Sequence, residues 1–104
     1  MSLSTHVLDA GTGLPAAGLT VTLELAGGEL LEGVTDADGR IRDFGAPGVG
    51  VHRIRFDTGT YFADRGVPTF YPEVVVAFEI TDAPAHHHVP LLLSPYAYST
   101  YRGS

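Results

Sequence analysis

The sequence predicts an all-β fold, an antiparallel sandwich, on three observations. Apolar and polar residues alternate with a period of two in several short segments, and turn residues separate these segments. The 13 glycines and 7 prolines among 104 residues supply many turns. The strands also follow one another without regular helices between them, which is typical of a sandwich. A chain of this length builds one hydrophobic core, so we expect a single domain over residues 1–104.

Three strands are expected in the first third of the chain. The first covers about Leu3 to Asp9. The second, around Leu19 to Leu25, is the clearest half-buried strand, because leucine and valine alternate there with threonine and glutamate. Gly27-Gly28 then suits a tight hairpin into a third strand at about Leu30 to Thr35.

The middle of the chain begins with a turn and a fourth strand. Asp36-Ala37-Asp38-Gly39 has the residues of a turn, and it places Arg40 at the edge of the next element, where its side chain can project. The strand covers about Val49 to Asp57, and its expected inward residues are His52, Ile54 and Phe56.

A short helix and a strongly apolar strand follow. The stretch Thr58 to Gly66 lacks alternation and has room for one short helix before Pro68. The strand Val74 to Ile80 is apolar on much of both sides. We therefore expect it in the middle of a sheet or under a partner.

The segment from His86 to Ser104 predicts a final hairpin that turns at Ser94-Pro95. Aliphatic residues at alternate positions from Val89 to Leu93 are expected to face the core. The opposite face of this sheet would then display residues from three separate segments, namely His6, Leu8, His86, His88, Ser99 and Tyr101. A partly apolar face that carries histidines and a tyrosine is expected to be a ligand surface, a subunit interface or both.

Composition excludes several classes of protein. A net charge of −6 and only six scattered basic residues argue against nucleic acid as a partner. No run of about eighteen apolar residues predicts a membrane helix, and the first residues lack the basic and apolar regions of a signal peptide. The absence of cysteine excludes disulfides and is compatible with a reducing compartment. We expect a cytoplasmic protein.

The histidine run raises the question of a metal site. His86 and His88 lie two apart on a strand and point the same way, as two imidazole ligands would. A third ligand would have to be His6 or His52, no cysteine is available, and no HExxH motif is present. Hydrogen-bonded strand histidines are the simpler interpretation, so no metal is expected.

Two further side chains allow alternative interpretations. Arg40 is either one partner of surface ion pairs with nearby aspartates or a permanently charged group aimed at a carbonyl or an anion. Tyr101 could equally pack against its neighbours or contact a ligand. The chain has no nucleophile elbow, P-loop or dinucleotide-binding fingerprint. Residue chemistry alone therefore predicts a sandwich with a histidine-bearing face and leaves its substrate open.

Three segments give the chain a family resemblance: STHVLDAGTGLPAAG (4–18), TDADGR (35–40) and VPLLLSPYAYSTYRGS (89–104). The chain resembles the transthyretin-like family and, by its final YRGS, the branch of that family that hydrolyses 5-hydroxyisourate. The resemblance implies a transthyretin-like sandwich of two four-stranded sheets, with eight strands and one short helix after the fifth. It also implies a homotetramer, a dimer of dimers with sites where the dimers meet.

The resemblance further implies a reaction and its residues. The substrate 5-hydroxyisourate is opened to 2-oxo-4-hydroxy-4-carboxy-5-ureidoimidazoline in purine (urate) catabolism, without cofactor or metal. His6, Arg40 and His88 correspond to the catalytic set, and Tyr101 and Ser104 join His6 and Arg40 in binding substrate. A histidine, His6 or His88, would activate the water that attacks a ring carbonyl, and Arg40 would stabilise the oxyanion.

Two positions depart from the family pattern: His87 stands where an aromatic is frequent, and Ala97 stands where glycine is usual. We expect His87 to point away from the site, and Ala97 to show whether the backbone there tolerates a side chain. Two other functions are compatible with such a face. One is a transthyretin-type carrier that binds a small ligand without catalysis, and the other is a structural assembly module.

Overall fold

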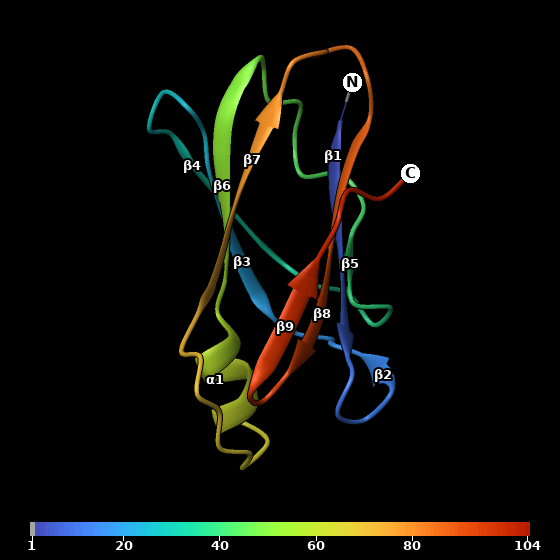
Figure 1. Cartoon of the computed structure of the whole chain (residues 1–104), viewed down its shortest axis with the longest axis vertical. Coiled ribbons are helices and arrows are strands. Elements are labelled where there is room, and N and C mark those ends of the chain that lie inside the picture. The colour runs from blue at the N-terminus through green and yellow to red at the C-terminus, as the bar shows by residue number, and fades with distance from the viewer. Residues whose placement is uncertain (1) are drawn as a thin grey trace.

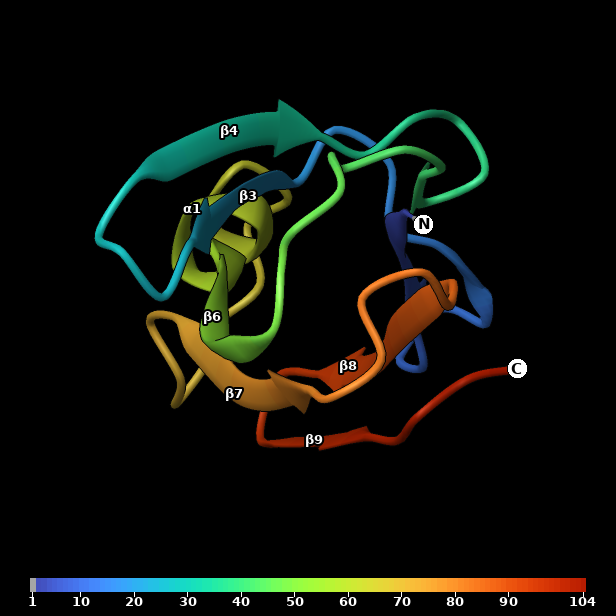
Figure 2. The ribbon, with the colours of Figure 1, turned by 90° about the horizontal axis from the view of Figure 1, so that it is seen from above.

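A computed structural model describes residues 2–104 as two β-sheets packed face to face, with one short helix (Figures 1 and 2). The helix lies at one end of the sandwich, and both chain termini lie toward the other end (Figure 1). The elements in chain order are β1 (Leu3–Asp9), β2 (Leu14–Pro15), β3 (Thr20–Glu24), β4 (Leu30–Val34), β5 (Arg40–Ile41), β6 (Gly50–Phe56), α1 (Thr58–Ala63), β7 (Val74–Ile80), β8 (His87–Ser94) and β9 (Ala97–Thr100).

The predicted all-β sandwich with one short helix is confirmed. One sheet has the order β2-β1-β8-β9 with β5 also beside β1, and the other has the order β4-β3-β6-β7. Residues 2–104 form nine strands where eight were expected, and the first sheet has five strands instead of four, because two strands of two residues each, β2 and β5, share the place beside β1. The short helix was expected after the fifth strand, and with the additional short strands it follows the sixth, β6.

One strand pair departs from the expected antiparallel pattern. β1 and β8 pair in parallel, from Leu3 opposite His87 to Asp9 opposite Leu93. A parallel pair needs a long crossover connection, and here the whole second sheet lies between the two strands in the sequence. This pair joins the beginning of the chain to its end, which local patterns could not indicate.

The position of β7 corrects one expectation. The strand lies at the edge of its sheet, next to β6 only, and not in the middle. Val76 and Phe78 pack against the core, whereas Val75 on the other side is 46% exposed. The alternative interpretation, that a partner covers this apolar strand, stays a prediction.

The core lies between the sheets, where the predicted alternation is confirmed. Its largest fully buried side chains come from both sheets and the helix: Phe56, Phe62, Leu3, Leu19, Leu23, Ile54, Ile80, Leu91, Leu93, Val7, Val21 and Val74. His52 is buried among them, and its Nδ1 accepts a hydrogen bond from Ala26 N–H (3.0 Å). The other nitrogen, Nε2, therefore carries the proton and donates to the Gly48 carbonyl (2.7 Å). His52 is thus a structural histidine and not a ligand.

Buried Asp9 joins the end of β1 to the helix. One carboxylate oxygen of Asp9 accepts the backbone N–H groups of Gly11 and Thr12, and the other accepts the Tyr61 hydroxyl (2.9 Å). Burial and the bond to Asp9 raise the pKa of Tyr61 to about 12.

Among residues 2–104 no helix is long and apolar enough to cross a membrane.

Tyr61→Phe should destabilise the fold by about 1–3 kcal/mol, because a buried carboxylate oxygen loses its donor. Since the folded state raises the pKa of Tyr61 above its ordinary value of 10.0, this stabilisation is complete below pH 10 and is lost as the pH rises toward about 12. Urea unfolding at several pH values measures the difference. Tyr96→Phe, at an exposed tyrosine, serves as the control. Equal unfolding midpoints for Tyr61→Phe and the parent at pH 7 would contradict this account.

Candidate active site

The turn from Asp36 to Gly39 places Arg40 directly beside His6. One Asp36 carboxylate oxygen accepts the N–H groups of Asp38 (2.8 Å) and Arg40 (3.0 Å), which closes the turn. Gly39 has a φ of 74°, and a Cβ there would lie 2.4 Å from the Val7 carbonyl oxygen, so only glycine fits. The strand β5 then pairs with β1, with Arg40 opposite His6.

The aspartates of this turn form their ion pairs with Arg42. Its guanidinium lies 3.7 Å from an Asp36 carboxylate oxygen and 3.0 Å from one of Asp38. Within residues 2–104, Arg40 has no ion pair of its own, and its side chain is half-buried. The surface ion-pair interpretation therefore applies to Arg42, and Arg40 keeps its charge available to a ligand.

His88 is held by groups on both sides of its strand. On one side β1 places Ser4 opposite it, and Ser4 Oγ lies 2.7 Å from His88 Nδ1. On the other side Gly103 N–H donates to the His88 carbonyl (2.9 Å). A Cβ on Gly103 would lie 2.4 Å from His88 Cδ2, so the imidazole occupies the space that glycine leaves.

The strand register brings the predicted face together. His6 lies opposite Arg40 on one side and Pro90 on the other, and Leu92 lies opposite Ser99. The His88–Gly103 bridge continues the same antiparallel register, in which Tyr101 falls opposite Pro90. Residues that are opposite in a ladder share a face, so His6, Arg40, His88 and Tyr101 all lie on the outer face of this sheet.

Electrostatics also link these groups. Burial lowers the pKa of His88, a hydrogen bond to Ser4 raises it, and repulsion by the charge of Arg40, and by His6 and His86 in their protonated forms, lowers it further. The net effect is a lowered pKa, so His88 is a neutral imidazole at pH 7. With Nδ1 bonded to Ser4, its Nε2 is the nitrogen available to a ligand.

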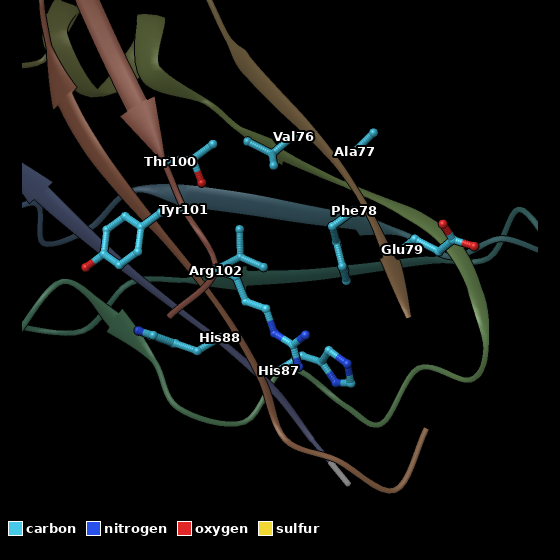
Figure 3. Close-up of a pocket in the computed structure, with 10 residues that line it drawn as sticks. Val76, Ala77, Phe78, Glu79, His87, His88, Thr100, Tyr101 and Arg102 are labelled. Atoms are coloured by element: carbon cyan, nitrogen blue, oxygen red, sulfur yellow. The ribbon is translucent and has the colours of Figure 1, made fainter. Parts of the chain in front are cut away.

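The segment after β9 splits its side chains between two directions. Tyr101 extends to the same side as His88, whereas Arg102 points the opposite way, toward His87 (Figure 3). The chain after β9 also curves away from the core (Figure 2). Ser104 follows the bridge at Gly103 and is exposed. Tyr101 is 59% exposed, which favours contact with a ligand or a partner over packing within this chain.

Two hollows flank these residues, and neither contains all of them. The larger, about 310 Å³, opens between β7 and the last hairpin and includes His88 and Tyr101 among its walls (Figure 3). The smaller, about 170 Å³, is lined by Arg40, Ser4 and His86 with two neighbours. The larger hollow lacks His6 and Arg40, so we place the site on the open outer face and not in that hollow.

The two departures from the family pattern are accommodated. His87 points inward, away from the site as expected, and its Nδ1 lies 3.0 Å from the Ala85 carbonyl. Among residues 2–104 every residue with a positive φ is a glycine, so Ala97 has an ordinary backbone conformation.

Within the same described residues, no group of three or more potential ligands could hold a metal ion.

Sequence reasoning missed the supports of His88. Ser4 and Gly103 contact the ring directly, and His86 bonds to Ser4 through Nε2 (3.0 Å). Ser4 precedes His6 by two residues, so alternation alone placed its side chain on the histidine-bearing face. No local signal indicated that β1 lies next to β8.

Gly103→Ala should displace the His88 ring without unfolding the protein, because the new methyl group would overlap Cδ2. We expect changed ring chemical shifts of His88 in NMR spectra and a thermal midpoint within a few degrees of the parent. Gly27→Ala, where a Cβ meets open space, is the matched control. His88 signals identical in the variant and the parent would show that the ring does not depend on this glycine.

The His88 imidazole should titrate below its ordinary 6.5, and Arg40→Gln should move the midpoint back toward that value. The folded state binds this proton less readily than the unfolded chain. The corresponding stability is therefore present above pH 6.5 and falls as the pH drops below it. NMR titration of the ring proton measures the midpoint, with Arg53→Gln in the other sheet as the control. An unchanged titration midpoint of His88 in Arg40→Gln would show that Arg40 does not affect the pKa of His88.

Comparison with known proteins confirms the family resemblance. The model of the HIUase/Transthyretin family matches residues 3–103. A 5-hydroxyisourate hydrolase of Salmonella dublin is 48% identical over 109 residues, covering 98% of this chain and 80% of the relative. Among solved structures, 5-hydroxyisourate hydrolase of Klebsiella pneumoniae superposes with a TM-score of 0.90 at 42% identity, covering 99% of this chain and 93% of that one.

The carrier branch of the family is also similar in structure. Sea bream transthyretin in complex with thyroxine has a TM-score of 0.88 and 31% identity, and the match covers 99% of this chain and 95% of that one. Both branches therefore share the fold, and the hydrolases share more of the sequence. With a family model spanning nearly its whole length, the chain belongs to the HIUase/Transthyretin family.

Proposed function

We propose that this chain hydrolyses 5-hydroxyisourate to 2-oxo-4-hydroxy-4-carboxy-5-ureidoimidazoline, as one domain that uses neither metal nor cofactor. The observation that carries the proposal is the common face of His6, Arg40 and His88 in a chain 48% identical to a hydrolase of this name. Hydrolysis of a cyclic amide is assisted by a base that activates water and by a positive charge that stabilises the oxyanion, and this face offers two imidazoles and an arginine for these roles.

His88 is the better candidate for the general base. A base must be neutral at the working pH, and burial together with neighbouring positive charge lowers the pKa of His88. Its Nε2 would take a proton from water as the water oxygen attacks the ring carbonyl. His6, diagonal to it on the face, would hold the substrate and the attacking water. Proton transfer of this kind contributes roughly 10²- to 10⁴-fold.

Arg40 would stabilise the negative charge that develops on the attacked carbonyl oxygen. Its guanidinium has no ion pair in the part of the chain that the structure describes, so it can form hydrogen bonds to the oxyanion and to the heterocycle. Tyr101 and Ser104 would orient the flat substrate from the other side of His88. The ring carbon–nitrogen bond then breaks, and the nitrogen takes up the proton that His88 Nε2 had taken from water, which returns His88 to its neutral form.

We further propose that the site is completed in a homotetramer, a dimer of dimers, in the cytoplasm. The outer face is open in a single chain, and neither of the two hollows includes both His88 and Arg40. The apolar edge strand β7, with Val75 46% exposed, supports an additional subunit contact. The absence of cysteine agrees with a reducing compartment.

Replacing His6, Arg40 or His88 by alanine should in each case lower turnover by at least about 10²-fold and leave the proposed tetramer intact. The decay of freshly generated 5-hydroxyisourate in ultraviolet absorbance measures turnover as the excess over spontaneous decay. Size-exclusion chromatography measures the assembly.

Arg53→Ala, an exposed arginine of the other sheet, is the control and should retain activity. Near-full activity in the three variants would refute the assigned roles. Absence of any rate excess in the parent would refute the hydrolase proposal and favour a transthyretin-type carrier, which equilibrium binding of an aromatic ligand would then reveal.

A further inference from the structure

Four side chains form a continuous hydrogen-bonded chain that ends at His88. Ser2 Oγ lies 2.9 Å from His86 Nδ1, His86 Nε2 lies 3.0 Å from Ser4 Oγ, and Ser4 Oγ lies 2.7 Å from His88 Nδ1. His86 is exposed, Ser4 is buried and His88 is half-buried. The chain therefore leads from solvent to the ring that faces the site.

Ser4 can donate only one proton, and when that proton lies in one of these two bonds the chain has two arrangements. If Ser4 donates to His86 Nε2, it must accept from His88 Nδ1–H, and Nε2 of His88 keeps a free lone pair. If His86 Nε2–H donates to Ser4, then Ser4 donates to His88 Nδ1, and the proton of His88 sits on Nε2. Only the first arrangement leaves His88 able to take a proton from water.

We propose that Ser4 and His86 are positioning residues that select the Nδ1–H tautomer of His88. His86 accepts the one hydroxyl proton of Ser4, and Ser4 in turn accepts from His88 Nδ1–H. The inference rests on the proposed function, because it explains how His88 is prepared as a base. Protonation of His86 would make its Nε2 a donor to Ser4, which frees the Ser4 proton for His88 Nδ1 and favours the tautomer of His88 with its proton on the nitrogen that faces the substrate.

Other charged groups around His88 do not supply this control. Arg40 from β5 and His6 from β1 act on the ring by charge, and Tyr101 lies on the same face. Each of them can shift the affinity of His88 for a proton, but none bonds to Nδ1. The Ser4 hydroxyl, together with His86 on its other side, therefore decides which nitrogen of His88 carries the proton.

Residue 86 offers a direct test, because its side chain is exposed. His86→Glu keeps an acceptor toward Ser4 and should preserve the Nδ1–H tautomer of His88 and at least a third of the parent turnover. His86→Lys supplies only a donor and should convert His88 to the Nε2–H tautomer. Its kcat should fall about 10- to 100-fold with KM changed less than about threefold. The ¹⁵N chemical shifts of His88 at neutral pH report the tautomer without any substrate.

Ser4 is tested by a matched pair. Ser4→Ala removes the hydroxyl and should give mixed tautomers of His88 with kcat lowered about tenfold. Ser4→Thr keeps the hydroxyl and should retain both the Nδ1–H tautomer of His88 and the parent kcat. Ser94→Ala, which removes a serine hydroxyl at the far end of β8, is the control for a general effect on the strand. Circular dichroism confirms that each variant is folded before it is compared.

The outcomes separate the two proposals. An Nε2–H tautomer in the parent at neutral pH, or an unchanged tautomer in both Ser4→Ala and His86→Lys, overturns the positioning role whatever the turnover. If His86→Lys changes the titration midpoint of His88 but leaves its tautomer the same, residue 86 acts by charge alone. This result also overturns the positioning role. A parent protein without hydrolysis, but with the predicted tautomers, refutes the proposed function and leaves the hydrogen-bonded chain established.

Discussion

The parallel pairing of β1 with β8 is the constraint on which the site depends. It joins residues more than eighty positions apart, from Leu3 opposite His87 to Asp9 opposite Leu93. The same pairing places Ser4 beside His88 and sets His6 one row further along the sheet. Each of the proposed catalytic groups except Arg40 lies on one of these two strands. Because both strands contribute leucine and valine to the core on their inner sides, burial of that core holds the outer face in register.

Two glycines complete the arrangement by allowing close approach. Gly39 brings the turn before β5 against the Val7 carbonyl, and this position sets Arg40 beside His6. Gly103 lies against the His88 ring and donates its N–H to the His88 carbonyl. In both cases a side chain would overlap backbone or ring atoms, so the geometry of the face depends on the absence of a Cβ. Rigid backbone of this kind suits a site whose groups must be held in place before substrate binds.

The face itself is unusual for a single chain. It combines half-buried imidazoles, an arginine that has no ion pair within residues 2–104 and an exposed tyrosine. One hollow beside it is lined by His88 and Tyr101 and the other by Arg40, and His6 lines neither. The carrier and hydrolase branches share this fold, with similar TM-scores of 0.88 and 0.90. What distinguishes them must therefore reside in side chains and not in the framework. In this chain a serine and a histidine outside the core, Ser4 and His86, lie behind the proposed base.

The sequence by itself determined the sandwich, the inward and outward sides of its strands and the histidine-bearing face, because alternation with a period of two is a local property that survives folding. It also indicated the short helix before Pro68, the family through three segments, and the hydrolase branch of that family through YRGS. Tertiary structure alone decided which strands are neighbours: β7 lies at an edge, β1 lies beside β8, and Arg42 and not Arg40 pairs with the aspartates. It also decided that Ser4 stands between His86 and His88. These contacts join distant segments, and their order in the sheets follows from burial of the whole core and not from any local pattern.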